Sequence, residues 1–284
     1  MTPPLFSVIV PVHRHWDLVP ALLEALADQR TDPARFEILI VNNDAPKPAP
    51  PLELPGNARM ITCATPGSYA ARNAGAAAAH GDWLAFTDAD CRPPPRWLEA
   101  LADATAGGGL LAGPVEIETP VPDTPFAVYD RVRGIPQPRY IARGYAATAN
   151  LAVPKPVFRA LGGFAPERFS GGDAEFCRRA GRAGHGLRLV ETARTVHLAR
   201  VDWAALADKT RRIKGGQIAA GPLPRRIAWS LRTLAPPLRD TLAFLHAPFP
   251  VSKRATAIAV RFRIWGVELA ETVRLLAGGA PERR

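Results

Sequence analysis

Cysteine is scarce in this sequence of 284 residues, and long apolar runs are missing. The three cysteines (Cys63, Cys91 and Cys177) are far apart and form no Cys-x-x-Cys pair, which argues against a disulfide framework or a zinc site and suits a reducing compartment. No stretch of about 18 uncharged apolar residues occurs, so no helix is obliged to cross a membrane. The N-terminus also lacks the basic and apolar regions of a signal peptide, and we therefore expect a cytoplasmic protein.

Acidic residues are few in the C-terminal quarter of the chain. Residues 209–284 contain 15 Lys and Arg against 4 Asp and Glu, whereas residues 1–208 contain 21 against 22. This imbalance predicts a partner with an anionic surface, either lipid or nucleic acid. Residues 256–276 place apolar side chains on one helical face, which favours an anionic membrane: Ile258, Phe262, Trp265, Leu269, Val273 and Leu276. Packing of these helices on the rest of the protein is the alternative.

Strand-like and helix-like segments alternate in the first half. Four segments are rich in apolar residues, as in strands buried on both faces: 6–12, 36–41, 58–63 and 83–86. Helical patterns lie between and after them, at 17–28, from Ser68 as a candidate N-cap to about His80, and at 95–106. The alternation predicts an α/β fold with a mostly parallel sheet flanked by helices. In contrast, residues 119–145 hold five prolines and predict an extended crossover.

Two carboxylates, Asp88 and Asp90, directly follow the fourth predicted strand. Buried charges are costly without a partner, and hard carboxylate oxygens suit Mg²⁺ or Mn²⁺. The segments 11–13 and 42–44 end two other strands, and ligands bind beyond the carboxyl ends of parallel strands. The three segments therefore predict a metal-assisted site at one edge of the sheet. A loop with two solvated carboxylates is the alternative.

Four motifs occur in a recognisable order: SVIVPV (7–12), ILIVNND (38–44), ARNAG (71–75) and GDWLAFTDADC (81–91). Their order and spacing resemble the family 2 glycosyltransferases of GT-A fold, over roughly residues 5–200. The resemblance implies a Rossmann-like sheet, a nucleotide-sugar donor, Mg²⁺ or Mn²⁺, and inverting transfer by a single displacement. We expect a GT-A catalytic domain at 1–205, with a nucleotide-sugar-binding half (1–118) and an acceptor half (119–205). A C-terminal basic amphipathic helical appendage would follow at 206–284.

The resemblance also implies roles for single residues. Asp90 would be a metal ligand, and Asp88 would reach the ribose or a metal-bound water. His197 stands where several members of the family have a third metal ligand, although a structural histidine is the alternative. The remaining donor-binding candidates are Pro11, His13, Asn42, Asn43, Asp44 and Arg72. Asn42 stands where Asp is common, which leaves base binding open between Asn43 and Asp44, or the Asn pair in a turn-forming role. Arg72 would face the diphosphate or pair with a carboxylate.

A second set of motifs comprises TANLAVP (148–154), LGGF (161–164) and SGGDAEFCRR (170–179). It resembles the family's acceptor signature, in which an acidic pair opens a helix; here Gly172 replaces the first acid and Asp173 keeps the second. Inverting transfer needs a base that removes the proton of the acceptor hydroxyl. We assign that catalytic role to Asp173, with a helix N-cap as the alternative. Glu175 is expected to pair with Arg178 or Arg179.

These features predict a cytoplasmic inverting glycosyltransferase, peripheral on the inner face of the cell membrane. It would move a sugar from a nucleotide-sugar, with UDP-sugars preferred, to a hydroxyl of a glycan or lipid-linked acceptor in cell-surface polysaccharide or glycolipid synthesis. A nucleotidyltransferase acting on sugar phosphates is one alternative, but residues 11–20 lack the glycine and lysine of its basic loop. A non-catalytic nucleotide-sugar or anionic-surface binding module is another. No nucleic-acid partner is expected.

Overall fold

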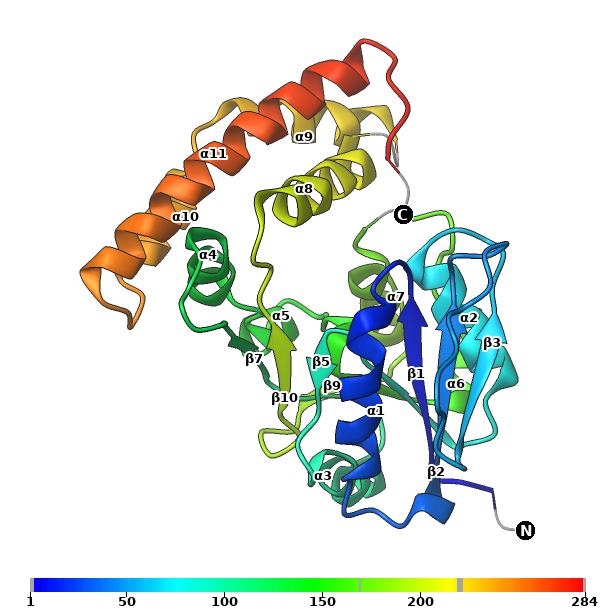
Figure 1. Cartoon of the computed structure of the whole chain (residues 1–284). Coiled ribbons are helices and arrows are strands. Elements are labelled where there is room, and N and C mark those ends of the chain that lie inside the picture. The colour runs from blue at the N-terminus through cyan, green and yellow to red at the C-terminus, as the bar shows by residue number, and fades with distance from the viewer. Residues whose placement is uncertain (1–2, 169, 219–221, 283–284) are drawn as a thin grey trace. The chain divides into compact units, whose positions relative to one another are not determined.

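The computed structural model describes residues 3–168, 170–218 and 222–282. The chain forms two compact units, each assembled from three segments. The sheet unit comprises Met1–Glu116, Ile135–Glu167 and Gly172–His197. The helical unit comprises Ile117–Gly134, Arg168–Gly171 and Leu198–Arg284. The helical unit is therefore formed by the C-terminal region together with two earlier segments (Figure 1).

A seven-stranded sheet forms the centre of the sheet unit, with strand order β3-β2-β1-β4-β8-β6-β9. Its strands are β1 (Phe6–Val12), β2 (Phe36–Asn42), β3 (Ala58–Thr62), β4 (Trp83–Phe86), β6 (Leu110–Ala112), β8 (Leu151–Pro154) and β9 (Leu187–Leu189). The first four are parallel, as the apolar runs predicted. Strand β8 is antiparallel to both β4 and β6, so the sheet is mostly parallel with one reversed strand. A small sheet has the order β5-β10-β7, with β5 (Cys91–Arg92), β7 (Val115–Glu118) and β10 (Thr195–Leu198).

Helices cover both faces of the large sheet. The α-helices of this unit are α1 (Val19–Ala27), α2 (Ser68–Ala78), α3 (Trp97–Ala104), α5 (Gln137–Ile141), α6 (Lys155–Ala160) and α7 (Gly172–Arg182). Short 3₁₀ turns lie at Trp16–Leu18, Pro33–Arg35, Thr105–Gly107 and Thr148–Asn150. Successive strand side chains point to opposite faces, so Val8 packs in a core with α1 and α3, whereas Ile9 packs in another with α2 and α7.

Two helical regions differ from the sequence prediction: the start of α2 and residues 119–145. Helix α2 begins at Ser68 but its N-cap is Gly67, so the N-cap prediction for Ser68 was wrong. Gly67 has φ +118°, a backbone conformation that residues other than glycine rarely adopt. Residues 119–145 are also not merely an extended crossover, because they form α4 (Pro125–Arg133) and α5. Pro125 and Pro138 lie in the first turns of these helices, where the missing N–H is tolerated.

The helical unit contains α4, α8 (Trp203–Ile218), α9 (Leu223–Leu234), α10 (Leu238–Leu245) and α11 (Val251–Leu276). Its core gathers buried side chains from four of these helices: Tyr129, Leu206, Phe244, Ala257, Val260 and Ile264. Helix α11 runs the length of the unit and contacts all four others (Figure 1). None of the described helices is both long enough and apolar enough to cross a membrane.

The predicted apolar face of residues 256–276 is not wholly free for a membrane. Ile258 packs against the core of the helical unit, and Trp265 Nε1 donates a hydrogen bond of 2.7 Å to the carbonyl oxygen of Thr233. Phe262, in contrast, is 38% exposed. Helix α11 therefore uses part of this face for packing inside the unit, because a helix of mixed sequence gains stability mainly by burying its apolar stripe.

Candidate active site

Asp88, Asp90 and His197 lie together beyond the carboxyl end of β4, the central strand of the large sheet. The two aspartates occupy the turn between β4 and β5. His197 lies on β10, where it pairs with Cys91 of β5. One carboxylate oxygen from each aspartate and one imidazole nitrogen lie within 4.8 Å of one another. His197 Nε2 is 3.3 Å from Asp90 Oδ2. The β5–β10 pairing thus brings a histidine from more than 100 positions away to the aspartates.

This donor set fits a divalent cation. Two hard carboxylates and one imidazole suit Mg²⁺ or Mn²⁺, which commonly keep open positions for water and phosphate oxygens. The histidine side chain is 3% exposed, while those of Asp88 and Asp90 are 29% and 27% exposed. The buried imidazole is therefore fixed, and the carboxylates remain accessible for a ligand that shares the ion.

Arg72 joins this group from helix α2. Its guanidinium is buried and forms an ion pair with the carboxylate of Asp88. Of the two sequence-based interpretations of Arg72, the structure shows the carboxylate pair. Its Nε atom is buried and has no hydrogen-bond partner among the described residues. The position of Asp88 is therefore set by a charge on the neighbouring helix, because a buried guanidinium is strongly disfavoured without an anionic partner.

The ends of β1 and β2 form a second polar cluster around Asp44. Its carboxylate accepts hydrogen bonds from the Arg14 backbone N–H (2.6 Å) and the Trp16 ring N–H (2.8 Å), and lies 2.9 Å from His13 Nδ1. Burial alone would raise the pKa of Asp44, but these hydrogen bonds and nearby positive charges hold it below its usual value. Arg14 has φ +65°, which is uncommon for a residue with a side chain. Backbone strain of this kind often accompanies binding sites.

Asn42 and Asn43 have structural hydrogen bonds. Asn42 accepts from the Asp44 N–H (2.9 Å) and donates to the Lys47 carbonyl (3.1 Å), which is the turn-forming role left open by the sequence. Asn43 donates to the carbonyls of Cys63 and Thr65 and accepts from the Gly67 N–H. It thereby holds the loop that leads into α2. Pro11 lies in β1, paired with β2, and its side chain is partly exposed.

Asp173 is the second residue of α7, so it is not the N-cap of that helix. Its Oδ1 accepts hydrogen bonds from the Ala174 N–H (2.8 Å) and the Tyr69 hydroxyl (3.2 Å). Burial raises the pKa of Asp173, and the charge of Asp88 acts in the same direction, although the Ala174 N–H, Arg72 and the Tyr69 hydroxyl oppose them. A raised pKa makes a carboxylate a stronger base, provided that it is still ionised at the working pH.

Tyr69 is a residue of this site that the motifs do not reveal. A Cβ atom at Gly172 would lie 2.7–2.8 Å from carbons of the Tyr69 ring. The ring therefore fills the space beside Asp173 that any side chain at position 172 would enter. The only signal in the sequence was Gly172, which stands where the family 2 glycosyltransferases often have an acidic residue.

Glu175 forms a two-pronged ion pair with Arg179, as expected. Arg179 Nε and Nη2 each lie 2.9 Å from a Glu175 carboxylate oxygen. Arg179 Nη2 also donates to the Gly163 carbonyl at 2.8 Å. This pair connects α7 to the glycine-rich segment before it and so supports the start of the helix that carries Asp173.

Comparison with known proteins identifies relatives across most of the chain. A family model described as glycosyl transferase family 2 matches residues 7–143. Glycosyltransferase AglE of Haloferax volcanii is 32% identical over 233 residues, which cover 79% of this chain and 76% of that protein. The pre-mycofactocin glycosyltransferase of Mycobacterium tuberculosis is 31% identical over 154 residues, which cover 49% of this chain and 32% of that protein.

Solved structures show the same fold. A mannosyltransferase from Pyrobaculum calidifontis, in complex with GDP-Man and Mn²⁺, has a TM-score of 0.55 at 16% identity and covers 97% of this chain and 88% of its own. TarS from S. aureus, in complex with UDP-GlcNAc, has a TM-score of 0.54 at 16% identity, with 96% and 92% covered. At this identity the likeness concerns the fold, which is GT-A. The long match to AglE extends it to the sequence, and the chain belongs to glycosyl transferase family 2.

Proposed function

We propose that this transferase uses a nucleotide-sugar donor and a divalent cation to glycosylate a hydroxyl group with inversion. The observation that carries the proposal is the Asp88–Asp90–His197 group, which lies on the same sheet unit as Asp173. Support also comes from the similar structures, which were solved with GDP-Man and Mn²⁺ or with UDP-GlcNAc.

Asp90, His197 and Asp88 would hold Mg²⁺ or Mn²⁺, which neutralises the charge that develops on a departing diphosphate. Arg72 keeps Asp88 oriented through their ion pair. His13 and Asp44 are the groups we assign to the base or ribose of the donor, since both asparagines are engaged in the loops. Asn42, Asn43 and Pro11 then shape the donor site without being its recognition groups.

Asp173 would accept the proton of the acceptor hydroxyl as its oxygen attacks the anomeric carbon and the bond to the diphosphate breaks. We propose a UDP-sugar as the donor, a glycan or a lipid-linked molecule as the acceptor, and synthesis of cell-surface polysaccharide or glycolipid as the role. The basic helical unit would place the enzyme at the inner face of the cell membrane, because anionic lipid attracts clustered arginine and lysine.

Diphosphate release from a panel of UDP-, GDP- and dTDP-sugars, with and without Mn²⁺ or Mg²⁺, tests the donor and the metal. We expect release from one base class only, and only with a metal. The Asp90→Ala variant should lose metal-dependent donor binding and nearly all release. The Asp82→Ala variant is the matched control, because Asp82 is an exposed aspartate before the same strand. Release by Asp90→Ala at the wild-type rate, with metal still required, would overturn this assignment.

A further inference from the structure

The exposed large apolar side chains of the described residues all lie in the helical unit. Seven of them are on two consecutive helices, α9 and α10, and each is 47–64% exposed: Leu223, Ile227, Leu231, Leu234, Leu238, Leu242 and Leu245. We call these seven residues the leucine face. Among the described residues, the large apolar side chains of the sheet unit are buried or partly buried, so exposed ones are confined to the helical unit.

The spacing of the leucine face puts it on one side of each helix. In α9 its members recur at intervals of three or four residues, and in α10 likewise, which is the period of one helical stripe. The opposite sides of both helices hold them to the unit. Thr233 of α9 is buried and its Oγ1 accepts a hydrogen bond from Lys214 Nζ (2.8 Å), and Phe244 of α10 packs in the core. Both helices also contact α11, which lies across them in Figure 1.

The charge around the leucine face selects its partner. Residues 222–254 contain six basic residues, namely Arg225, Arg226, Arg232, Arg239, Lys253 and Arg254. They contain one acid, Asp240, whose carboxylate accepts a 2.7 Å hydrogen bond from Arg261 Nε. Of the six basic residues, Lys253 pairs with Asp123 of the same unit at 2.6 Å. A second copy of this chain would bring the same basic face to a two-fold contact, where like charges repel. An anionic bilayer instead supplies hydrocarbon for the leucines and negative head groups for the arginines.

We propose that the leucine face of α9 and α10 inserts into the head-group boundary of an anionic lipid bilayer, with Arg226 and Arg239, the exposed arginines that the helical period places beside it, at the phosphates. This inference deepens the membrane part of the proposed function, because it names the surface and moves it from the α11 stripe to α9 and α10. It rests on the proposed function only in relating membrane binding to glycosyl transfer. Lipid binding itself requires neither donor nor metal.

Co-flotation of the full chain with vesicles tests the surface. The probes are phosphatidylcholine vesicles with 0–40% phosphatidylglycerol at two salt concentrations. We expect binding to increase at least tenfold with anionic lipid, to weaken with salt, and to leave an apolar remainder at high salt. The Leu231→Ser/Leu242→Ser double variant should lose at least tenfold in binding to anionic vesicles. The matched control is Val273→Ser, an apolar residue that is 67% exposed but lies outside the leucine face.

Two further measurements keep the outcomes distinct. Circular dichroism and donor-dependent diphosphate release report whether the double variant folds, since neither residue belongs to the candidate active site. Equal vesicle binding by the double variant and the wild type would overturn the proposal, as would binding that ignores anionic lipid. Self-association of the wild type that the double variant abolishes, without any vesicle binding, would assign the face to a second copy instead. Lost vesicle binding with normal diphosphate release would leave the glycosyltransferase function standing.

Discussion

Asp173 shares its environment with a side chain from 104 positions earlier in the chain, the Tyr69 hydroxyl. The contact exists because Gly172 has no side chain, which leaves room for the tyrosine ring beside the carboxylate. Burial around Asp173 disfavours its ionised form, whereas the hydrogen bond from the Tyr69 hydroxyl favours it. Its basicity is therefore adjustable by a residue that would not itself exchange protons with the acceptor.

The Asp173→Asn variant should bind donor nearly as the wild type does but turn over roughly 10²–10⁴ times more slowly, which is the usual contribution of a general base. Asparagine keeps the shape of the side chain and cannot accept the proton. Titration of donor binding and steady-state rates with the acceptor present check the two parts separately. If donor affinity collapses while bound donor still reacts at the normal rate, Asp173 is a binding residue.

The Tyr69→Phe variant should show a pH–rate profile whose acid limb lies at higher pH than in the wild type, since a hydrogen bond to the ionised carboxylate is lost. Removing the hydroxyl takes a donor from the carboxylate, so the pKa of Asp173 rises further and more of it is protonated at low pH. Rates between pH 5 and 9 check this. Tyr140→Phe, which alters a tyrosine stacked on Tyr145, is the control and should leave the profile unchanged. An unchanged acid limb in the Tyr69→Phe variant would show that the Tyr69 hydroxyl does not influence the pKa of the catalytic base.

Part of the candidate site was predictable at this scale: Asp88 and Asp90 stand where a strand ends, whereas His197 was expected only from the family resemblance. Asp88, Asp90 and His197 do meet in the structure. The position of Arg72 against Asp88 was one of two alternatives. Tyr69 was not predictable, because its role depends on the space left by a glycine on another helix. The structural use of Asn42 and Asn43 in loop turns also depends on backbone geometry that residue types alone do not fix.

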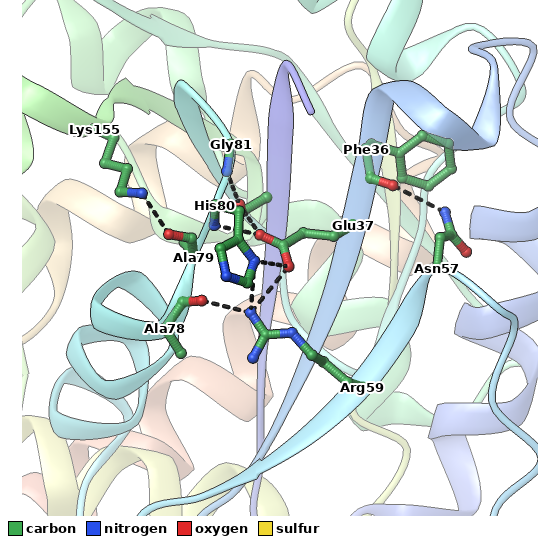
Figure 2. Close-up of polar contacts among 10 residues, drawn as sticks. Phe36, Glu37, Asn57, Arg59, Ala78, Ala79, His80, Gly81 and Lys155 are labelled. Carbon is green, nitrogen blue, oxygen red and sulfur yellow. Dashed lines mark hydrogen bonds and ion pairs between the residues drawn. The ribbon is translucent and has the colours of Figure 1, made fainter. Parts of the chain in front are cut away.

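At the scale of elements, Glu37 connects several segments near the amino end of β2, whereas the candidate site lies beyond the carboxyl ends of the strands. The Glu37 carboxylate accepts a hydrogen bond from the Ser7 hydroxyl (2.6 Å). It also accepts one from the His80 backbone N–H (2.5 Å) and pairs with Arg59 at 3.0 Å (Figure 2). Arg59 Nη2 also donates to the Ala78 carbonyl at 2.5 Å. One side chain of β2 therefore joins β1, β3 and the end of α2.

This network lowers the pKa of Glu37 to about 2, even though burial by itself would raise it. A carboxyl group with a depressed pKa stabilises the fold above its unfolded-state pKa, and that stability is lost as the pH falls towards 2. The Glu37→Gln variant should therefore be less stable than the wild type by about 2–3 kcal/mol near pH 7.

Urea unfolding at a series of pH values checks the Glu37 prediction. The gap in unfolding free energy between the two proteins should narrow as the pH falls from about 5 to about 2, because the wild type then loses the same charge. The exposed Glu53→Gln substitution is the control and should change stability little at any pH. If the difference in unfolding free energy stays constant over this range, the ionised carboxylate of Glu37 does not contribute to stability.

The strands were predictable at this scale, and their directions were only partly so. Runs of apolar residues, β-branched in β1 and β2, define β1, β2 and β4, because a parallel strand covered on both faces has no polar side. Nothing local in residues 151–154 indicates that β8 lies antiparallel between β4 and β6. Helices α4 and α5 were likewise hidden by their prolines, which mark helix starts as readily as extended chain.

At the scale of the whole molecule, each unit holds a strongly acidic carboxylate, and that of the helical unit is Asp130. It is 3% exposed and accepts hydrogen bonds from Arg200 Nη1 (3.0 Å) and the Arg200 N–H (3.2 Å), with Lys209 Nζ at 3.9 Å. Burial would raise the pKa of Asp130, but the charges of Lys209 and Arg200 bring it to about 2. Burial lowers the pKa of Lys209 well below its usual value, and the charge of Arg200 adds to this.

The Asp130→Asn variant should lose about 3–5 kcal/mol of stability near pH 7, since removing one partner of a buried pair leaves the other charge without compensation. Differential scanning calorimetry measures this loss. The difference from the wild type should shrink below about pH 4, where the wild-type carboxylate begins to take up its proton in the unfolded chain. Asp208→Asn breaks an exposed pair with Arg211 and should cost under about 1 kcal/mol. Similar losses for the two variants would mean that Asp130 is better solvated than its burial indicates.

The interleaving of the two units has a consequence for recombination. The helical unit takes α4 from residues 117–134, between two stretches of the sheet unit, and its other helices from beyond residue 198. Tyr129 of α4 packs in the same core as Phe244 of α10 and Ile264 of α11. A chimera that exchanges only the C-terminal helices with a relative would thus combine a foreign bundle with the resident α4 and leave its core mismatched. A workable swap must therefore exchange the α4 segment and the C-terminal helices at once.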